Sequence, residues 1–188
     1  QEKLTNPALQ FSGKEADFVT YILKDQPAPP KYFAVMKHLN KADRPLLVEV
    51  PKLAELNQKE IDNAIKNGLI VIDARPKAVS SQGFISGSFL IENMKTFSTF
   101  AGSIVDYQNQ IILIAEENQI EDLMRKLMRI GMDNIYGYIT NPSEQNLTLQ
   151  NVKTIDIETF KSYLGNKKIQ KIDVRTESEY KSGHIKGV

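Results

Sequence analysis

The sequence contains Ile72-Asp73-Ala74-Arg75 and, after seven intervening positions, Gly83-Phe84-Ile85-Ser86-Gly87. The pattern returns 100 residues later as Ile172-Asp173-Val174-Arg175 and Gly183-His184-Ile185-Lys186-Gly187, with six identical positions in register. A period of about 100 residues is too long for a solenoid and suits a duplicated small domain. The alternative is two unrelated strands that both end in an acidic residue. We favour duplication, because six matches in register are improbable by chance.

The repeat predicts where the domains lie. We expect the first copy over residues 49–145 and the beginning of a second copy over residues 150–188, with the polar stretch Asn141 to Asn151 as the linker. The second copy is expected to be truncated, because its sequence stops just after the repeated motif. Without the rest of its sheet, Lys168 to Val174 should be disordered or paired with another segment.

The first copy alternates short apolar runs with helical patterns. Nearly continuous apolar runs are typical of parallel strands that are buried on both faces. The runs are Leu69 to Asp73, Ser88 to Ile91, Gln110 to Ala115 and Asn134 to Ile139, and the predicted helices are Gln58 to Asn67, Asn93 to Val105 and Gln119 to Ile130. The pattern predicts an α/β fold with a central parallel sheet flanked by helices.

The candidate site is the loop after the most apolar strand, because ligands of such sheets bind beyond the carboxyl ends of the strands. The loop consists of Ala115, Glu116, Glu117, Asn118 and Gln119. The helix that follows carries an apolar stripe, formed by Ile120, Leu123, Met124, Leu127 and Ile130. Asn118 and Glu121 have the spacing of a capping box, which predicts that this helix begins at Gln119.

Composition excludes several classes of function. The 24 Lys and Arg balance 23 Asp and Glu, so the net charge of +1 gives no reason to expect nucleic acid as a partner. No apolar run approaches the roughly 20 residues that span a bilayer, and no leader peptide is apparent, so we expect a cytoplasmic protein without a membrane partner. The absence of Cys excludes disulfides and thiolate metal sites.

The repeated motif resembles the opening signature of rhodanese-like domains. The second copy carries it most fully, in Ile172-Asp173-Val174-Arg175, Glu179-Tyr180 and Gly183-His184-Ile185-Lys186-Gly187, and the first copy is a more divergent version. The resemblance implies that the signature residues are structural and tie the end of a strand to the following loop. These residues are Asp73, Arg75, Asp173, Arg175, Glu179 and His184.

The resemblance also implies what an active domain would need. In rhodaneses a Cys at the end of the central strand lies over a helix N-terminus, which stabilises its thiolate and the persulfide it carries. The loop Ala115 to Gln119 has neither Cys nor Arg, and Glu116 and Glu117 would repel an anion. We therefore expect the first copy to be an inactive rhodanese-like domain with a degenerate active-site loop and no catalytic residue.

Residues 1–48 resemble the segment that closes the metallo-β-lactamase-fold domain of persulfide dioxygenase and rhodanese fusion proteins. The resemblance rests on Glu2 to Pro7, Phe18-Val19, and Pro27 to Phe33 with Met36-Lys37 and Leu39-Asn40. It implies a parent that holds non-haem iron and oxidises a persulfide, but it places the iron ligands and the catalytic Cys outside this chain. With only His38 and His184 available, we expect no metal or cofactor here.

The favoured hypothesis is a non-catalytic spacer or docking module in such a sulfide-detoxifying fusion enzyme. Its partners would be the catalytic domains of the same polypeptide, and it could form a homo-oligomer. The alternative is that Glu116, Glu117, Glu121 and Asp122 form an acidic rim that binds a cation or a basic partner, although carboxylates also favour a helix N-terminus without any ligand. A third reading is a free-standing enzyme of another chemistry.

Overall fold

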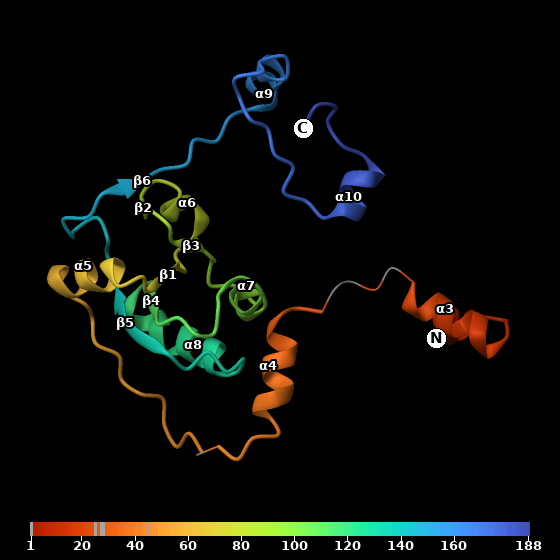
Figure 1. The fold of residues 1–188 in the computed structure, drawn as a ribbon, viewed down its shortest axis with the longest axis horizontal. Coiled ribbons are helices and arrows are strands. Elements are labelled where there is room, and N and C mark those ends of the chain that lie inside the picture. The colour runs from red at the N-terminus through yellow and green to blue at the C-terminus, as the bar shows by residue number, and fades with distance from the viewer. Residues whose placement is uncertain (1, 25, 27–28, 45) are drawn as a thin grey trace.

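A computed structural model describes residues 2–24, 26, 29–44 and 46–188 (Figure 1). Pro27 and Ala28, within the Pro-rich stretch used for the resemblance, lie outside the described residues. Among the residues that are described, no helix combines the length and the apolar character needed to cross a bilayer.

The centre of the molecule is a four-stranded parallel sheet in the order β3-β1-β4-β5. Its strands are β1 (Ile70–Asp73), β3 (Phe89–Leu90), β4 (Ile111–Ile114) and β5 (Ile135–Ile139). Glu55 forms a parallel bridge to Tyr138, so the segment just before residue 58 extends the sheet beyond β5. All four strands overlap the apolar runs of the sequence, which confirms the predicted parallel sheet flanked by helices.

Helices cover both faces of the sheet, as Figure 1 shows. On one face, α5 (Gln58–Lys66) buries Ile61 and Ala64 against Ile112 and Ile114. On the other face, α7 (Phe97–Ile104) and α8 (Glu117–Met128) form the larger core, with residues of neighbouring strands such as Ile72 and Leu113. Successive residues of a strand therefore point into opposite cores. Both sets of side chains are buried, which explains why the strand sequences are apolar at every position.

The stretch from Asn141 to Asn151 is more ordered than the predicted linker. Pro142 is fully buried, and Leu147 and Leu149 pack against the core beside α5. β6 (Leu149–Gln150) pairs antiparallel with β2 (Phe84–Ile85), which follows α6 (Lys77–Ser80). Contacts with the sheet body thus run past residue 145, and we call residues 49–152 the first unit.

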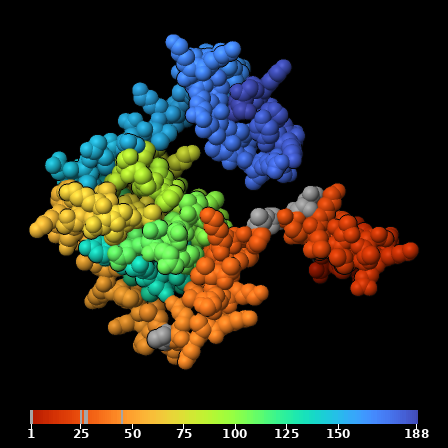
Figure 2. Space-filling view, in the orientation of Figure 1, coloured from red at the N-terminus to blue at the C-terminus, as the bar shows by residue number. Residues whose placement is uncertain are grey.

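Residues 153–188, here called the second unit, contain α9 (Ile157–Tyr163) and α10 (Glu177–Ser182). The segment 168–174 forms no strand, and Ile172 and Val174 are exposed, unlike the buried Ile72 and Ala74 of the first copy. Figures 1 and 2 show the second unit as a separate body joined to the first by an extended connection.

The N-terminal region is helical. It contains α1 (Glu2–Thr5), α2 (Pro7–Gln10), α3 (Glu15–Leu23) and α4 (Tyr32–Leu39). Phe11 stacks on Tyr21 of α3 with 5.2 Å between ring centroids. α4 differs from the other three, because its Tyr32 and Met36 pack against the larger core of the first unit.

Candidate functional site

The loop after β4 turns directly into α8. Ala115 is fully buried at the end of the strand, and its N–H donates to the Ile139 carbonyl at 3.2 Å. Glu116 is the N-cap residue, but its side chain accepts no capping hydrogen bond. The predicted capping box was wrong, because the turn closes through Gln119 N–H donating to the Glu116 carbonyl at 2.9 Å. Asn118 and Gln119 are therefore already helical.

The acidic residues around this loop do not act as one group. Glu121 accepts two hydrogen bonds from Arg125, at 2.6 and 2.9 Å. Asp122 forms an ion pair with Lys126 at 2.8 Å, and the hydrogen bond from Lys126 holds the pKa of Asp122 below its ordinary value. Of the four rim carboxylates, Glu116 and Glu117 have no ion pair among the described residues. Two of the four rim charges are thus neutralised on their own helix, which weakens the cation-binding alternative.

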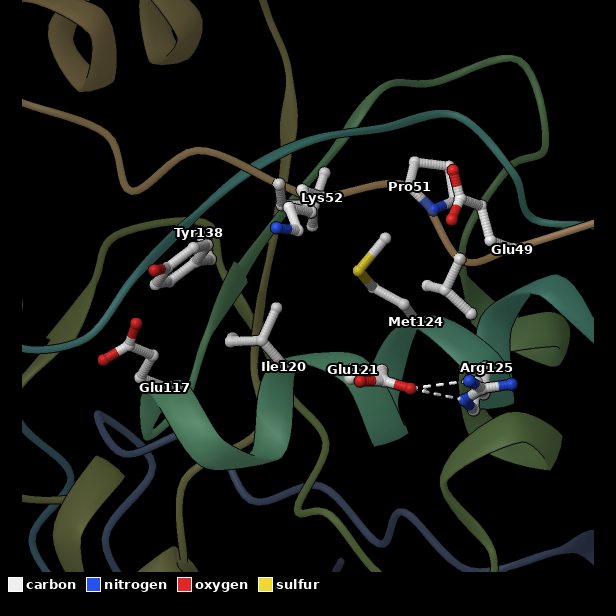
Figure 3. A pocket seen from close by; sticks show the side chains of 11 residues that line it. Glu49, Pro51, Lys52, Glu117, Ile120, Glu121, Met124, Arg125 and Tyr138 are labelled. Atoms are coloured by element: carbon white, nitrogen blue, oxygen red, sulfur yellow. Dashed lines mark hydrogen bonds and ion pairs between the residues drawn. The ribbon is translucent and has the colours of Figure 1, made fainter.

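A groove of about 490 Å³ lies beside the loop, between α8 and the extended segment that precedes α5 (Figure 3). Ile120 and Met124 form an apolar floor, and Glu117 lies near one end. Tyr138 closes the groove from β5, and burial, followed by the charges of Glu117 and Glu55, raises the pKa of its hydroxyl. Tyr138 is therefore protonated at neutral pH and is unsuited to act as a base there.

One kind of catalytic arrangement, a hydroxyl or thiol nucleophile beside a histidine, is absent from the described groove lining and loop. A nucleophile must lie next to a base or in a setting that lowers its pKa, and the described lining of the groove contains no Cys, His, Ser or Thr. Among the described residues, no three His, Cys, Asp or Glu side chains are grouped so that they could hold a metal ion. The described residues thus offer no ligand set for the non-haem iron that the resemblance implies for the parent protein.

The signature residues form the same network in both copies. Arg75 Nε donates to Asp73 Oδ1 at 2.9 Å, and its Nη2 donates to the Gly83 carbonyl at 2.7 Å. In the second copy, the corresponding distances from Arg175 to Asp173 and to the Gly183 carbonyl are 3.0 and 2.9 Å. In both copies the arginine thus ties the aspartate two residues before it to the start of the glycine motif, although only the first copy forms a strand there.

The turn that follows this network is repeated as well. Gly87 and Gly187 have φ values of +81° and +88°, in the left-handed region that favours glycine. Ser88 N–H donates to the Ile85 carbonyl at 3.0 Å, and Val188 N–H donates to the Ile185 carbonyl at 3.2 Å. Backbone geometry therefore supports a duplication, independently of the side chains that first suggested it.

The two copies differ in the helix between these elements. Glu179 accepts from the N–H and hydroxyl of Thr176, at 2.9 and 2.6 Å, and forms a capping box. His184 stacks on Tyr180 with 3.8 Å between centroids, and its Nδ1 lies 3.0 Å from the Tyr180 carbonyl. The equivalent positions in the first copy are Pro76, Val79, Ser80 and Phe84, which cannot form these contacts. The first copy therefore keeps the arginine tie and the glycine turn but lacks the capping box and the ring stack.

Sequence reasoning missed the contact between α4 and the first unit. Tyr32 lies over Gly102 of α7, where a Cβ atom would be only 2.8 Å from its Cδ1. Leu39 contacts Gly131, at the end of α8, in the same way. The signal in the sequence was Gly102, at a helix position where alanine is intrinsically better, together with the apolar spacing of Tyr32, Met36 and Leu39.

No protein-family model matches the chain, and a comparison with curated proteins finds no match. Among solved structures, the chain is similar to a metallo-beta-lactamase from Staphylococcus aureus subsp. aureus COL, with 30% identity and a TM-score of 0.63 over 73% of this chain and 38% of that chain. A rhodanese-like domain from Anabaena sp. also aligns, with 12% identity and a TM-score of 0.45 over 65% of this chain and 89% of that domain. The chain therefore spans less than two fifths of the length of the staphylococcal metallo-beta-lactamase to which it is similar.

Proposed function

We propose that residues 49–152 are a non-catalytic rhodanese-like module that positions the segments on either side of it. The parent would be a fusion protein that oxidises persulfides, with non-haem iron in a preceding metallo-β-lactamase-fold domain. Its partners would be the other domains of the same polypeptide, and its location would be the cytoplasm. The likeness to part of a longer metallo-beta-lactamase supports the fusion, since this chain corresponds to only a portion of that protein.

The residues of the loop before α8 support the proposal that the module is non-catalytic. A persulfide or thiosulfate site requires a Cys and a cradle of positive potential, whereas the start of α8 carries the unpaired carboxylates Glu116 and Glu117. The body beneath the loop is nevertheless well packed, with β4 completely buried. A well-packed core, combined with a loop whose carboxylates would repel an anion, supports a structural role for the module.

The contact between α4 and the first unit is the observation on which the proposed positioning role rests. Tyr32 and Met36 join the core that α7 and α8 share, and Leu39 reaches Gly131. Just after α4, Arg44 forms an ion pair with Asp133, which follows α8. The segment that would close the preceding domain is thus fixed to the first unit at several points, which a flexible linker would not be.

Replacement of Gly102 by Leu in the full-length protein tests this role. The new side chain occupies the space of the Tyr32 ring, so α4 should detach and the persulfide oxidation rate, followed by oxygen consumption, should fall at least threefold. Limited proteolysis between residues 40 and 52 should accelerate. Gly165→Leu is the matched control, because nothing lies within 4 Å of a Cβ atom at that position.

A second substitution separates detachment from misfolding. Tyr32→Ala makes room for the Leu at position 102, so the double variant should recover oxidation and protease resistance at least in part. An unchanged oxidation rate in Gly102→Leu, with proteolysis showing that α4 is released, would contradict the positioning role.

A further inference from the structure

The helix α7 has apolar residues on three sides, and only two of these sides are covered. Phe97 and Ala101 are buried in the larger core, and Gly102 receives Tyr32 of α4. On the third side, Phe100 and Ile104 are 50% and 47% exposed. Ser98, Thr99 and Ser103 occupy the remaining, polar part of the helix, so the exposed pair Phe100 and Ile104 marks this third side as a candidate interaction surface.

A pocket of about 430 Å³ lies against this third side, beyond the carboxyl ends of β1 and β3. Its apolar lining is extended by Leu90, Ile91 and Met94. Arg75, Lys77 and Glu92 contribute charge to the lining, and Arg75 is paired with Asp73. Glu92 accepts a hydrogen bond from the Lys77 backbone N–H at 3.3 Å, but neither the Glu92 nor the Lys77 side chain has an ion pair among the described residues. The pocket is distinct from the groove beside Glu117, with which it shares no residue.

The connection to the second unit begins in the wall of this pocket. Val152 and Thr154 both line it, and Val152 N–H donates to the Ser81 carbonyl at 2.9 Å. The next apolar residues are Ile155 and Ile157, at the start of α9. Ile157 lies three positions beyond Thr154, a span of about 10 Å when the chain is extended. Ile157 can therefore reach the pocket while the connection stays in place.

Ile157 also differs from its counterpart in the first copy. α5 and α9 are capped by Asn57 and Asp156, and alignment at these caps places Gln58 opposite Ile157. Gln58 is bound through its side chain to Asp62, whereas Ile157 is 67% exposed. An apolar side chain at this position has no role within the second unit of this structure.

We propose that the start of α9, with Ile155 and Ile157, docks in the pocket beside α7 and holds the second unit against the first. Lys153 has no ion pair among the described residues and would meet Glu92 at the rim. The short tether gives the two surfaces an effective concentration on the order of millimolar, so modest complementarity suffices. The proposal rests on the positioning role above, since it names the second unit as a segment that the first unit positions.

The absence of Cys allows a direct test on the 188-residue chain. The variant Ile104→Cys with Ile157→Cys should form an intramolecular disulfide under mild oxidation at least tenfold faster than Val79→Cys with Ile157→Cys, as followed by intact mass. Val79 is a matched control, because it is 49% exposed and lies near Ser81 but does not line the pocket. Equal rates, or a faster reaction at Val79, would overturn the proposal.

Charge exchange provides a second readout. In the Ile104→Cys and Ile157→Cys background, Glu92→Lys should slow disulfide formation severalfold, and adding Lys153→Glu should restore it. A rate indifferent to both changes would refute the proposed pairing. The disulfide test uses the 188-residue chain and measures no catalysis, so a negative result would refute the docking of α9 without bearing on the α4 contact. A negative result for Gly102→Leu would refute the positioning role of α4 without changing the disulfide rates.

Discussion

Replacement of Asp73 by Asn removes the charge that compensates Arg75 at the end of β1. The Asp73 side chain is fully buried and that of Arg75 is 11% exposed, with 2.6 Å between Oδ2 and Nη2. Asn keeps nearly the same shape and one acceptor oxygen, so the main loss is electrostatic. Removal of one partner of a buried ion pair costs about 3 to 5 kcal/mol, because the other charge stays buried.

The magnitude can be measured by urea unfolding. A loss of about 3 kcal/mol lowers the urea midpoint by about 2 M, at an m value near 1.5 kcal/mol per M for a body of this size. Circular dichroism of the 188-residue chain follows the transition, which the first unit dominates because it contains the sheet. The slope of the transition should remain that of the parent chain.

The repeat supplies the control within the same molecule. Asp173→Asn removes an equivalent charge, but Arg175 is 43% exposed and remains solvated, so the change in the urea midpoint should be small. A midpoint shift for Asp73→Asn no larger than that for Asp173→Asn, which lies outside the unit that dominates the transition, would refute the reasoning, because loss of the charge beside the buried Arg75 would then have no measurable cost.

Two further predictions concern packing and pH. Gly137→Ala should destabilise the first unit by about 1 to 3 kcal/mol through overpacking, because the new Cβ atom would lie 2.5 Å from Leu56 Cδ2. Chemical denaturation measures this loss. Gly165→Ala is the control and should have little effect, because nothing lies within 4 Å of a Cβ atom there. Hydrogen bonds from Arg175 lower the pKa of Asp173 from 3.8 to about 2, so the ionised carboxylate stabilises the second-copy network above pH 4 and this contribution is lost as pH falls toward 2. A carboxyl titration followed by NMR should show that pKa, and an ordinary value near 3.8 would contradict the network.

The sequence was sufficient for the sheet and for the helix that follows β4. Runs such as Ile111 to Ile114 are apolar at every position because helices cover both faces, and this rule depends only on local composition. The stripe from Ile120 to Leu127 likewise identifies α8, although not its first residue, because the turn after β4 closes through backbone atoms rather than through Asn118.

Features that depend on distant partners could not be predicted in this way. β6 consists of Leu149 and Gln150 alone and exists because β2 is available beside it. The contact of α4 depends on two glycines about 70 and 90 positions later, whose missing side chains make room for Tyr32 and Leu39. Local patterns do not say which distant residues will form such pairs, whereas the structural role of Asp73 and Arg75 was expected from the resemblance to the rhodanese signature.

The most direct test of the central claim is persulfide oxidation and sulfur transfer by the full-length protein with Glu116→Gln and Glu117→Gln combined. The resemblance to rhodanese-like domains would place the anion site of an active domain at these carboxylates, which have no ion pair among the described residues. A non-catalytic positioning module predicts that both rates stay within twofold of the unmodified protein, with oxygen consumption and thiocyanate formation as the readouts. A loss of tenfold or more in either rate, with α4 still protected from proteolysis, would show that the loop takes part in the chemistry and would contradict the account.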